Sequence, residues 1–394
     1  MIFNMKVKNL RGIIIAFLLV LSATLLLLSY LQTGPEASRA NNISLGSIAN
    51  TGIHTVNTPT LPKSESSLNV VAVGDILLGR SVKTRVEAQK DRYLYPFEKV
   101  VGMFHNGDVV FGNLEEAITS STKSLTGIHE GGKYVLKDEV EAIKGIKYSG
   151  LNLLSIANNH ILDYYEKGLF DTIKILDKNK IAYAGAGKNI SEARKLTIIE
   201  KKGLKIGLLA YTDMAYITYK GNPKLSFYAD VNKAGVAPTK EEYILQDIKK
   251  AREKVDILIV SLHWGVEDSF ISTPEQVKFA HKLMDRGVDI ILGHHPHHYQ
   301  GIEVYKGKPI VYSMGNFLFD QNHPENQEGF ILNMKFTDKK LSSMEAVPMR
   351  IINMSQVVPQ FGKNAAALLQ RELGLCKKLK AKCSIIDSKI VFDL

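Results

Sequence analysis

Short apolar runs alternate with amphipathic stretches from Leu68 onward, and this alternation predicts an α/β fold. The runs bounded by Gly, Asn, Asp or His read as strands, at 68–75, 108–115, 151–160, 204–212, 255–265 and 288–297. The stretches with apolar residues at helical spacing read as helices, at 137–150, 167–180, 240–254 and 274–287. Residues 308–320 and 329–351 resemble antiparallel hairpin strands.

A longer apolar run precedes this pattern. Residues 12–31 carry no charge, and twenty residues at about 1.5 Å each span the roughly 30 Å core of a bilayer. A secretory signal has a shorter apolar region, and "EASRA" is a poor cleavage site, so we favour a transmembrane signal-anchor over a cleaved signal. Because Lys6, Lys8 and Arg11 flank the run, residues 1–11 are expected in the cytoplasm and the remainder outside the cell.

Three further regions follow the apolar run. Residues 32–67 are rich in Ser, Thr, Asn, Pro and Gly, a composition that predicts a flexible linker. Residues 68–354 are long enough for one large domain. Residues 355–394 include the helical pattern "AAALLQRELGLC", and we expect them to form an appendage outside the main sheet.

The chain has a net charge of +10, and three of the positive charges precede the apolar run. A solvated surface is the default interpretation of the later lysines, and an extracellular anionic polymer is their natural counter-charge; the sequence contains no nucleic-acid-binding motif. Cys376 and Cys383 are the only cysteines. In a continuous helix they would lie about 10.5 Å apart, whereas a disulfide requires about 7 Å, so a bridge would need a turn between them.

Polar clusters end five of the predicted strands. Open α/β sheets bind ligands beyond the carboxyl ends of their strands. Any one of these clusters alone is more often a turn or a helix cap, but five together favour a shared site. The clusters are Gly74-Asp75, Asn113-Leu114-Glu115, Asn158-Asn159-His160, His263-Trp264-Gly265 and Gly293 to His297.

Six motifs carry a family resemblance: "VGDILLGR", "FGNLEEAIT", "NNHILDY", "SLHWG", "GHHPHHYQG" and "YSMGNFLFD". In this order they resemble the CapA (PgsA) family of poly-γ-glutamate capsule synthesis proteins, with a calcineurin-like metallophosphoesterase arrangement, over residues 68–320. The resemblance implies a four-layer α/β/β/α sandwich of the metallo-dependent phosphatase type outside the membrane. It also implies an anionic polymer, poly-γ-glutamate, and the membrane subunits of a capsule polymer synthase as partners.

The same resemblance assigns site residues. His160 matches an imidazole that faces the substrate and is the candidate catalytic residue, whereas His294 and His298 are expected to be hydrogen-bonded neighbours. Leu77 stands where the phosphoesterase pattern has a histidine, and Gly107-Asp108 lies at the wrong end of its strand to supply the bridging carboxylate. The candidate metal ligands are Asp75, Glu115, Asn159, His263, His295 and His297.

Nitrogen and oxygen ligands without thiolate favour Mn, Fe, Zn or Mg, as one or two ions. Arg80 and Asn316 are candidates for contacting an anionic ligand, with a surface charge and a turn as the alternatives. Trp264 either lines the pocket or packs in the core. Two functions therefore stay open: an accessory protein that holds polymer or metal, and an active metal-dependent hydrolase that cleaves a phosphoester or a polymer amide.

Overall fold

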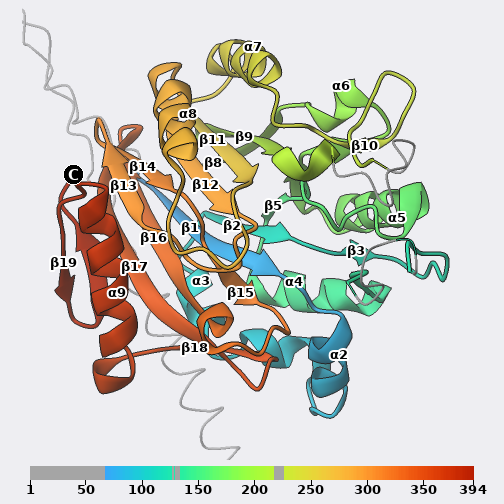
Figure 1. Ribbon diagram of the computed structural model, residues 1–394, viewed down its shortest axis with the longest axis horizontal. Coiled ribbons are helices and arrows are strands. Elements are labelled where there is room, and N and C mark those ends of the chain that lie inside the picture. The colour runs from blue at the N-terminus through green and yellow to red at the C-terminus, as the bar shows by residue number, and fades with distance from the viewer. Residues whose placement is uncertain (1–66, 127, 129–133, 217–225) are drawn as a thin grey trace, which may run out of the picture. The chain divides into compact units, whose positions relative to one another are not determined.

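Two large β-sheets dominate the computed structural model, which describes residues 67–126, 128, 134–216 and 226–394 (Figure 1). Helices accompany both sheets, so the expected mixed α/β class is confirmed. The expected membrane span and all but the last residue of the expected linker lie outside the described residues. Within the described ranges, no helix combines the length and the apolar character that crossing a bilayer requires.

The larger sheet has ten strands and is centred on β1. β1 runs parallel to β2 and β15 and antiparallel to β16, with Val70 opposite both Val109 and Met334. Its strands are β1 (Ser67–Ile76), β2 (Val109–Leu114), β5 (Leu153–Ser155), β6 (Ala182–Ala184), β15 (Asn316–Leu318), β16 (Glu328–Thr337), β17 (Lys340–Ile352), β18 (Gln356–Pro359), β19 (Cys383–Ile386) and β20 (Lys389–Phe392).

The smaller sheet has six strands in the order β13-β14-β12-β11-β9-β8, and its central strands β9, β11, β12 and β14 are parallel. These strands are β8 (Thr197–Lys201), β9 (Leu204–Thr212), β11 (Ile257–His263), β12 (Ile290–His294), β13 (Ile302–Tyr305) and β14 (Lys308–Val311). Two short pairs lie outside the large sheets: β3 (Ala117–Ile118) with β4 (Lys137–Asp138), and β7 (Ala186–Gly187) with β10 (Gly235–Val236).

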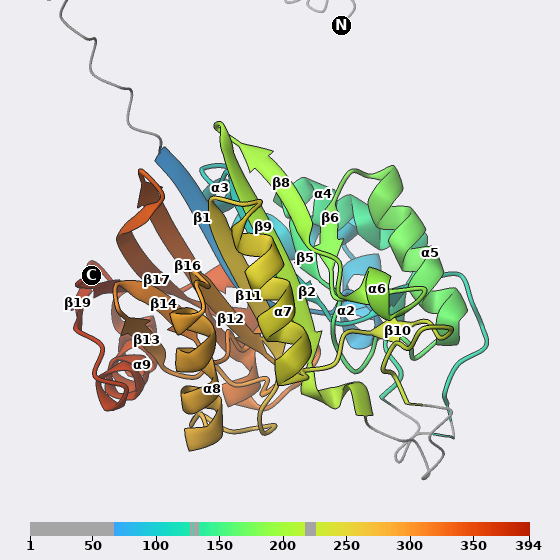
Figure 2. The ribbon, with the colours of Figure 1, turned by 90° about the horizontal axis from the view of Figure 1, so that it is seen from above.

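Alternating side chains along the strands divide the core into three clusters. Leu208 of β9 packs between the two sheets together with Val70 of β1, whereas the neighbouring Leu209 packs against the helices behind the smaller sheet. Val71 likewise faces the helices behind the larger sheet. The elements therefore form helix, sheet, sheet and helix layers (Figure 2). Strands β1 and β9 each carry apolar side chains on both faces.

One group of helices covers the outer face of the larger sheet, and a second group covers that of the smaller one. The first group contains α2 (Arg80–Glu87), η1 (Arg92–Phe97), α3 (Val101–Phe104), α4 (Ile143–Ser149) and α5 (Tyr165–Lys178), and the second contains α7 (Glu241–Arg252) and α8 (Pro274–Asp285). The remaining helical elements are η2 (Val140–Ala142), α6 (Ile190–Ala193), η3 (Asp213–Tyr216), η6 (Pro324–Gln327), η7 (Gly362–Asn364) and α9 (Ala366–Lys378).

The C-terminal residues join the main sheet, so the expectation that they pack outside it is wrong. β20 pairs with β17, with Ala346 opposite Ile390, and β19 extends the sheet further. Helix α9 buries Leu368 and Leu375 in the cluster between the sheets. The physical reason is that this apolar face closes an end of the inter-sheet core that would otherwise be open to water.

Two strand assignments from the sequence also change. The run 151–160 is extended only as far as Ser155, and the residues after it form the loop that carries His160. Residues 308–320 do not form a hairpin, because β14 belongs to the smaller sheet and β15 to the larger. Ile310 packs behind the smaller sheet and Phe317 behind the larger one, so the two apolar halves of this segment are buried in different cores. The hairpin expected at 329–351 is present as β16 and β17.

Candidate metal centre

The carboxyl ends of strands from both sheets bring the candidate ligands together. Asp75 lies near the end of β1, Glu115 directly follows β2, and His263 ends β11. His295 and His297 follow β12. All five side chains are buried, which agrees with a shared site at the strand ends.

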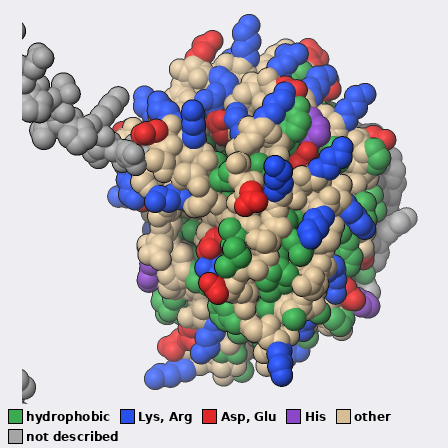
Figure 3. Space-filling view, turned by 90° about the vertical axis from the view of Figure 1, so that its left-hand side faces the viewer, with side chains coloured by type: hydrophobic (Ala, Val, Ile, Leu, Met, Phe, Trp, Pro, Cys, Tyr) green, Lys and Arg blue, Asp and Glu red, His purple; other side chains and the backbone are tan. Residues whose placement is uncertain are grey.

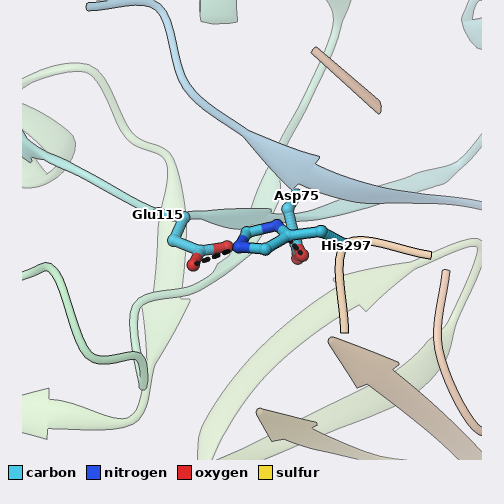
Figure 4. A group of neighbouring side chains, drawn as sticks. All are labelled: Asp75, Glu115 and His297. Carbon is cyan, nitrogen blue, oxygen red and sulfur yellow. Dashed lines mark ion pairs between the residues drawn. The ribbon is translucent and has the colours of Figure 1, made fainter. Parts of the chain in front are cut away.

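Asp75, Glu115 and His297 form the closest group, with one ligand atom of each within 4.8 Å of the others (Figure 4). Oε1 of Glu115 lies 3.7 Å from Nε2 of His263 and 4.0 Å from Nε2 of His297. This oxygen is buried and has no hydrogen-bond partner among the described residues. A buried carboxylate oxygen without a partner costs free energy, and a cation shared with the two imidazoles would remove that cost, so the residues fit a metal.

A second set of candidate ligands lies on the His263 side of Glu115. Oδ1 of Asn159 is 2.8 Å from Nε2 of His263, and the rings of His263 and His295 have centroids 4.9 Å apart. Nδ1 of His295 is buried and lacks a hydrogen-bond partner within the described part of the chain. The donor atoms of Asn159, His263 and His295 thus gather beside the carboxylate that the first group also uses.

Neighbouring side chains hold these groups in place. His294 donates from Nδ1 to Oδ1 of Asp75 at 2.9 Å, and the amide of Asn113 donates to the same oxygen at 2.9 Å. Nδ1 of His297 donates to Oδ1 of Asn316 at 2.9 Å, which directs Nε2 of that imidazole toward Glu115. Histidines that bind metals typically have such a partner on the other ring nitrogen.

Asn316 is buried, and its side-chain oxygen accepts a hydrogen bond from Nδ1 of His297. Its amide nitrogen donates to Oε1 of Gln321 at 2.7 Å and to the carbonyl of Asn326 at 2.9 Å. Asn316 is not in a turn, because β15 pairs with β1 and places Asn316 opposite Asp75.

His160 lies at the edge of the site and is paired with Asp163. Its Nδ1 lies 2.8 Å from Oδ2 of Asp163, which also accepts a hydrogen bond from the backbone N–H of Leu136 at 2.7 Å. Nε2 of His160 lies 3.2 Å from the amide of Asn159. The motif analysis did not assign Asp163 a role, although its position three residues after His160 was visible in "NNHILDY".

Burial and mutual charge set the protonation of the site. Burial and the Asp75 carboxylate raise the pKa of Glu115 well above its usual value. Burial alone would raise the pKa of Asp75, but the His294 hydrogen bond and the nearby imidazoles bring this pKa below its usual value. Burial lowers the pKa of His263 well below its usual value and that of His295 to about 3. Both imidazoles are therefore neutral near pH 7, which is the form that binds a metal.

The backbone of the histidine tract is strained. His295 has φ +96° and His297 has φ +57°, both in the left-handed region that residues other than glycine rarely adopt. Gly293, just before the tract, has no room for a side chain, since a Cβ atom there would lie 1.9 Å from the carbonyl oxygen of Tyr312. Such strain often accompanies a functional site. Here the His297 imidazole lies near Asp75 and Glu115, and the His295 ring lies next to that of His263.

Trp264, Arg80 and His298 have other partners in the structure. Trp264 packs behind the smaller sheet against Tyr312 and Phe279 and donates to the carbonyl of Tyr312 at 3.0 Å, so it belongs to the core and does not line the pocket. Arg80 pairs with the buried Asp320 at 3.1 Å. His298 stacks on Phe270, with ring centroids 4.4 Å apart.

Two departures from the phosphoesterase pattern have structural explanations. Leu77, at the position of the missing histidine, is fully buried in the core behind the larger sheet. Asp108 lies at the opposite end of β2 from Glu115, where it accepts a hydrogen bond from the backbone N–H of Asn69 at 2.8 Å and pairs with Lys202 at 3.0 Å. Glu115 is therefore the carboxylate that β2 delivers to the site.

Comparisons with known proteins agree with the motifs. Residues 69–321 match the family model described as "Bacterial capsule synthesis protein PGA_cap". The chain is 31% identical to the capsule biosynthesis protein CapA of Bacillus anthracis, over 74% of this chain and 70% of that protein. It is also 31% identical to the PGA biosynthesis protein CapA of Bacillus subtilis (strain 168), over 84% of this chain and 83% of that protein.

Solved structures are more distant. The calcineurin-like phosphoesterase YfkN of Bacillus subtilis aligns with a TM-score of 0.42 and 14% identity, over 80% of this chain and 99% of that chain. Similarity at this level is too weak to support an argument about the activity of this protein.

Proposed function

The chain belongs to the PGA_cap family of bacterial capsule synthesis proteins, and from this premise we propose that it acts in the synthesis or export of poly-γ-glutamate. The names of the relatives from Bacillus anthracis and Bacillus subtilis support this assignment. In the proposed role, the protein is an accessory component that binds the anionic polymer next to the capsule polymer synthase subunits of the membrane.

We further propose that residues 12–31 anchor the protein and residues 32–67 tether it, with the domain outside the cell. The apolar length of the first segment and the basic residues before it support this arrangement. The helix, sheet, sheet and helix layers, with ligands at the strand ends of both sheets, support a fold of the metallo-dependent phosphatase type.

The site is proposed to hold one or two divalent ions, Mn, Fe, Zn or Mg. The observation that carries this proposal is the buried Oε1 of Glu115, which faces the imidazoles of His263 and His297 without a hydrogen-bond partner among the described residues. Asp75, Glu115 and His297 would hold one ion, and Glu115, Asn159, His263 and His295 a second. Because Leu77 supplies no ligand, the first position has fewer donors, and a single tightly bound ion is the simpler expectation.

A bound divalent ion would polarise a carbonyl or phosphoryl oxygen and would also bind the carboxylate of a polymer. The chain itself would position that ligand. His294 and Asn113 fix Asp75, and Asn316 fixes His297, so the ligand atoms need little rearrangement.

A metal-dependent hydrolase is the second candidate function, and the His160–Asp163 pair favours it. Asp163 holds the Nδ1 side of His160, which leaves Nε2 beside Asn159 to take up or release a proton. A general acid or base in this position typically contributes about 10²–10⁴-fold to a rate.

One set of assays separates the two functions. The full chain in detergent would be tested for binding of poly-γ-glutamate, for cleavage of that polymer and for cleavage of a phosphodiester. The accessory role predicts polymer binding without turnover. If the wild type turns over either substrate and both Asp75→Ala and His160→Ala abolish this activity, the protein is a hydrolase and the accessory role is wrong. If the wild type does not bind poly-γ-glutamate, the proposed polymer role is wrong.

A further inference from the structure

A cavity lies at the start of α5. It has a volume of about 380 Å³, within the usual range for ligand pockets. Its wall comes from three segments: the loop after β3, the first turn of α5 and the residues that precede β10. α5 and β10 lie near each other in both ribbon views.

This cavity shares a wall with the His160 side of the metal centre. Leu162 lines it two residues after His160, and Leu125 lines it from the facing loop. The backbone N–H of Leu125 donates to the carbonyl of Asp163 at 2.9 Å, and the carboxylate of Asp163 holds His160. A ligand in the cavity would therefore be separated from His160 by one layer of residues.

Two lysines supply the charge of the cavity. Nζ of Lys123 lies 5.2 Å from the ring centroid of Tyr165, and Nζ of Lys233 lies 4.2 Å from that of Tyr228. Lys233 also donates to the carbonyl of Ser226 at 2.6 Å and to its hydroxyl at 3.1 Å. Among the described residues, neither ammonium group has a carboxylate within 4.0 Å, so neither charge is neutralised by a direct ion pair.

Two charged residues of α5 also belong to the described lining of the cavity. Lys167 lines the cavity but is paired with Asp171 at 2.8 Å, so it adds little. Among the described lining residues, Glu166 is the one carboxylate. The positive charge is thus modest but local, in contrast to the face that carries α9 and β19, where Lys and Arg side chains are dispersed (Figure 3).

The lining combines the two ammonium groups with an apolar surface from Leu125, Leu162 and Phe227. A ligand that matches both has carboxylates on a short aliphatic chain, as a glutamyl polymer does. We propose that this cavity is a subsite for the carboxylates of a polyanionic glutamyl chain that continues from the metal centre. The inference rests on the proposed function, because that function supplies the polymer.

The test compares two double variants of the full chain in detergent. Lys123→Gln with Lys233→Gln removes the two charges of the subsite. Lys250→Gln with Lys254→Gln is the matched control, since these exposed lysines line a different cavity beside α7. Binding of a fluorescent γ-glutamate oligomer is measured by anisotropy, with polyphosphate of equal charge as the second ligand and metal content as the check on the neighbouring site.

We expect the subsite variant to bind the γ-glutamate oligomer about tenfold more weakly, as loss of charged hydrogen bonds predicts, with its metal content retained. The control should change binding by no more than about twofold, as expected for exposed charges. The subsite proposal is wrong if the subsite variant and the control variant lose γ-glutamate binding equally. It is also wrong if the subsite variant loses only polyphosphate binding.

Two further results keep the test decisive. If the double variant does not fold, Lys123→Gln alone decides, because Lys123 is exposed and its loss should still weaken binding by about threefold. If the wild type binds no γ-glutamate oligomer, the proposed polymer function fails; if the wild type and the subsite variant bind equally well, only the subsite fails.

Discussion

Glu372 on α9 should make the stability of the protein depend on pH. Its carboxyl group is buried, and Oε1 accepts a hydrogen bond from Sγ of Cys376 at 3.0 Å. Oε2 has no hydrogen-bond partner among the described residues. Burial, partly offset by the Cys376 contact, raises the pKa of Glu372 from 4.5 to about 8.

The sign of the effect follows from proton binding. Between pH 4.5 and about 8 the folded protein keeps the proton on Glu372, whereas the unfolded chain has released it. The folded state thus binds more protons, so the free energy of unfolding falls as the pH rises through this window. Each pKa unit corresponds to about 1.4 kcal/mol, so the loss is at most about 5 kcal/mol.

Glu372→Gln keeps the shape of the side chain and removes the titration. Urea unfolding at several pH values, followed by the fluorescence of Trp264, the single tryptophan, would measure this component. The variant and the wild type should differ little at pH 5, and the variant should gain several kcal/mol relative to the wild type by pH 9. Glu242→Gln, on the exposed surface of α7, is the control and should show no such change. A stability difference between Glu372→Gln and the wild type that is the same at pH 5 and pH 9 would refute the reasoning.

Three other predictions concern the core and the site. Deleting residues 361–394 should abolish cooperative urea unfolding, because α9 and β20 complete the inter-sheet core; an unchanged transition would contradict this. Gly293→Ala should lower stability by at least about 2 kcal/mol, measured by thermal unfolding, because its Cβ would meet the Tyr312 carbonyl at 1.9 Å; an unaltered melting temperature would count against it. His160→Ala should keep its metal by elemental analysis, whereas His295→Ala should lose it; equal loss in both would make His160 a ligand.

The strand-end pattern predicts that polar residues from separate strands lie near one another, and the structure brings several of them together. Asp75, Glu115 and His263 each end an apolar run, and parallel strands bring such ends to one edge. The sequence could not show that these strands belong to two facing sheets. The division into sheets depends on which strands pair and on which face of each strand packs against the other sheet. It also left Asp163 without a role, since its contact with His160 depends on the path of the loop after β5.

Long-range pairing explains the errors in the fold. The helix of "AAALLQRELGLC" was evident from its local pattern, but the pairing of β20 with β17 joins residues far apart in the sequence. Trp264 follows a site histidine directly, yet its ring packs behind the smaller sheet because adjacent residues near the end of β11 face opposite sides. Neither feature has a local signal in the sequence.

Metal content is the most direct test of the central claim. The full chain, purified in detergent and equilibrated with Mn, Fe, Zn or Mg, would be analysed by inductively coupled plasma mass spectrometry, beside His297→Ala and His298→Ala. These adjacent histidines are both buried, but only His297 faces Asp75 and Glu115. We predict one or two bound ions in the wild type and in His298→Ala, and at least about tenfold weaker binding in His297→Ala. A wild type that binds none of these ions, or a His297→Ala variant that binds them as well as the wild type does, would contradict the account.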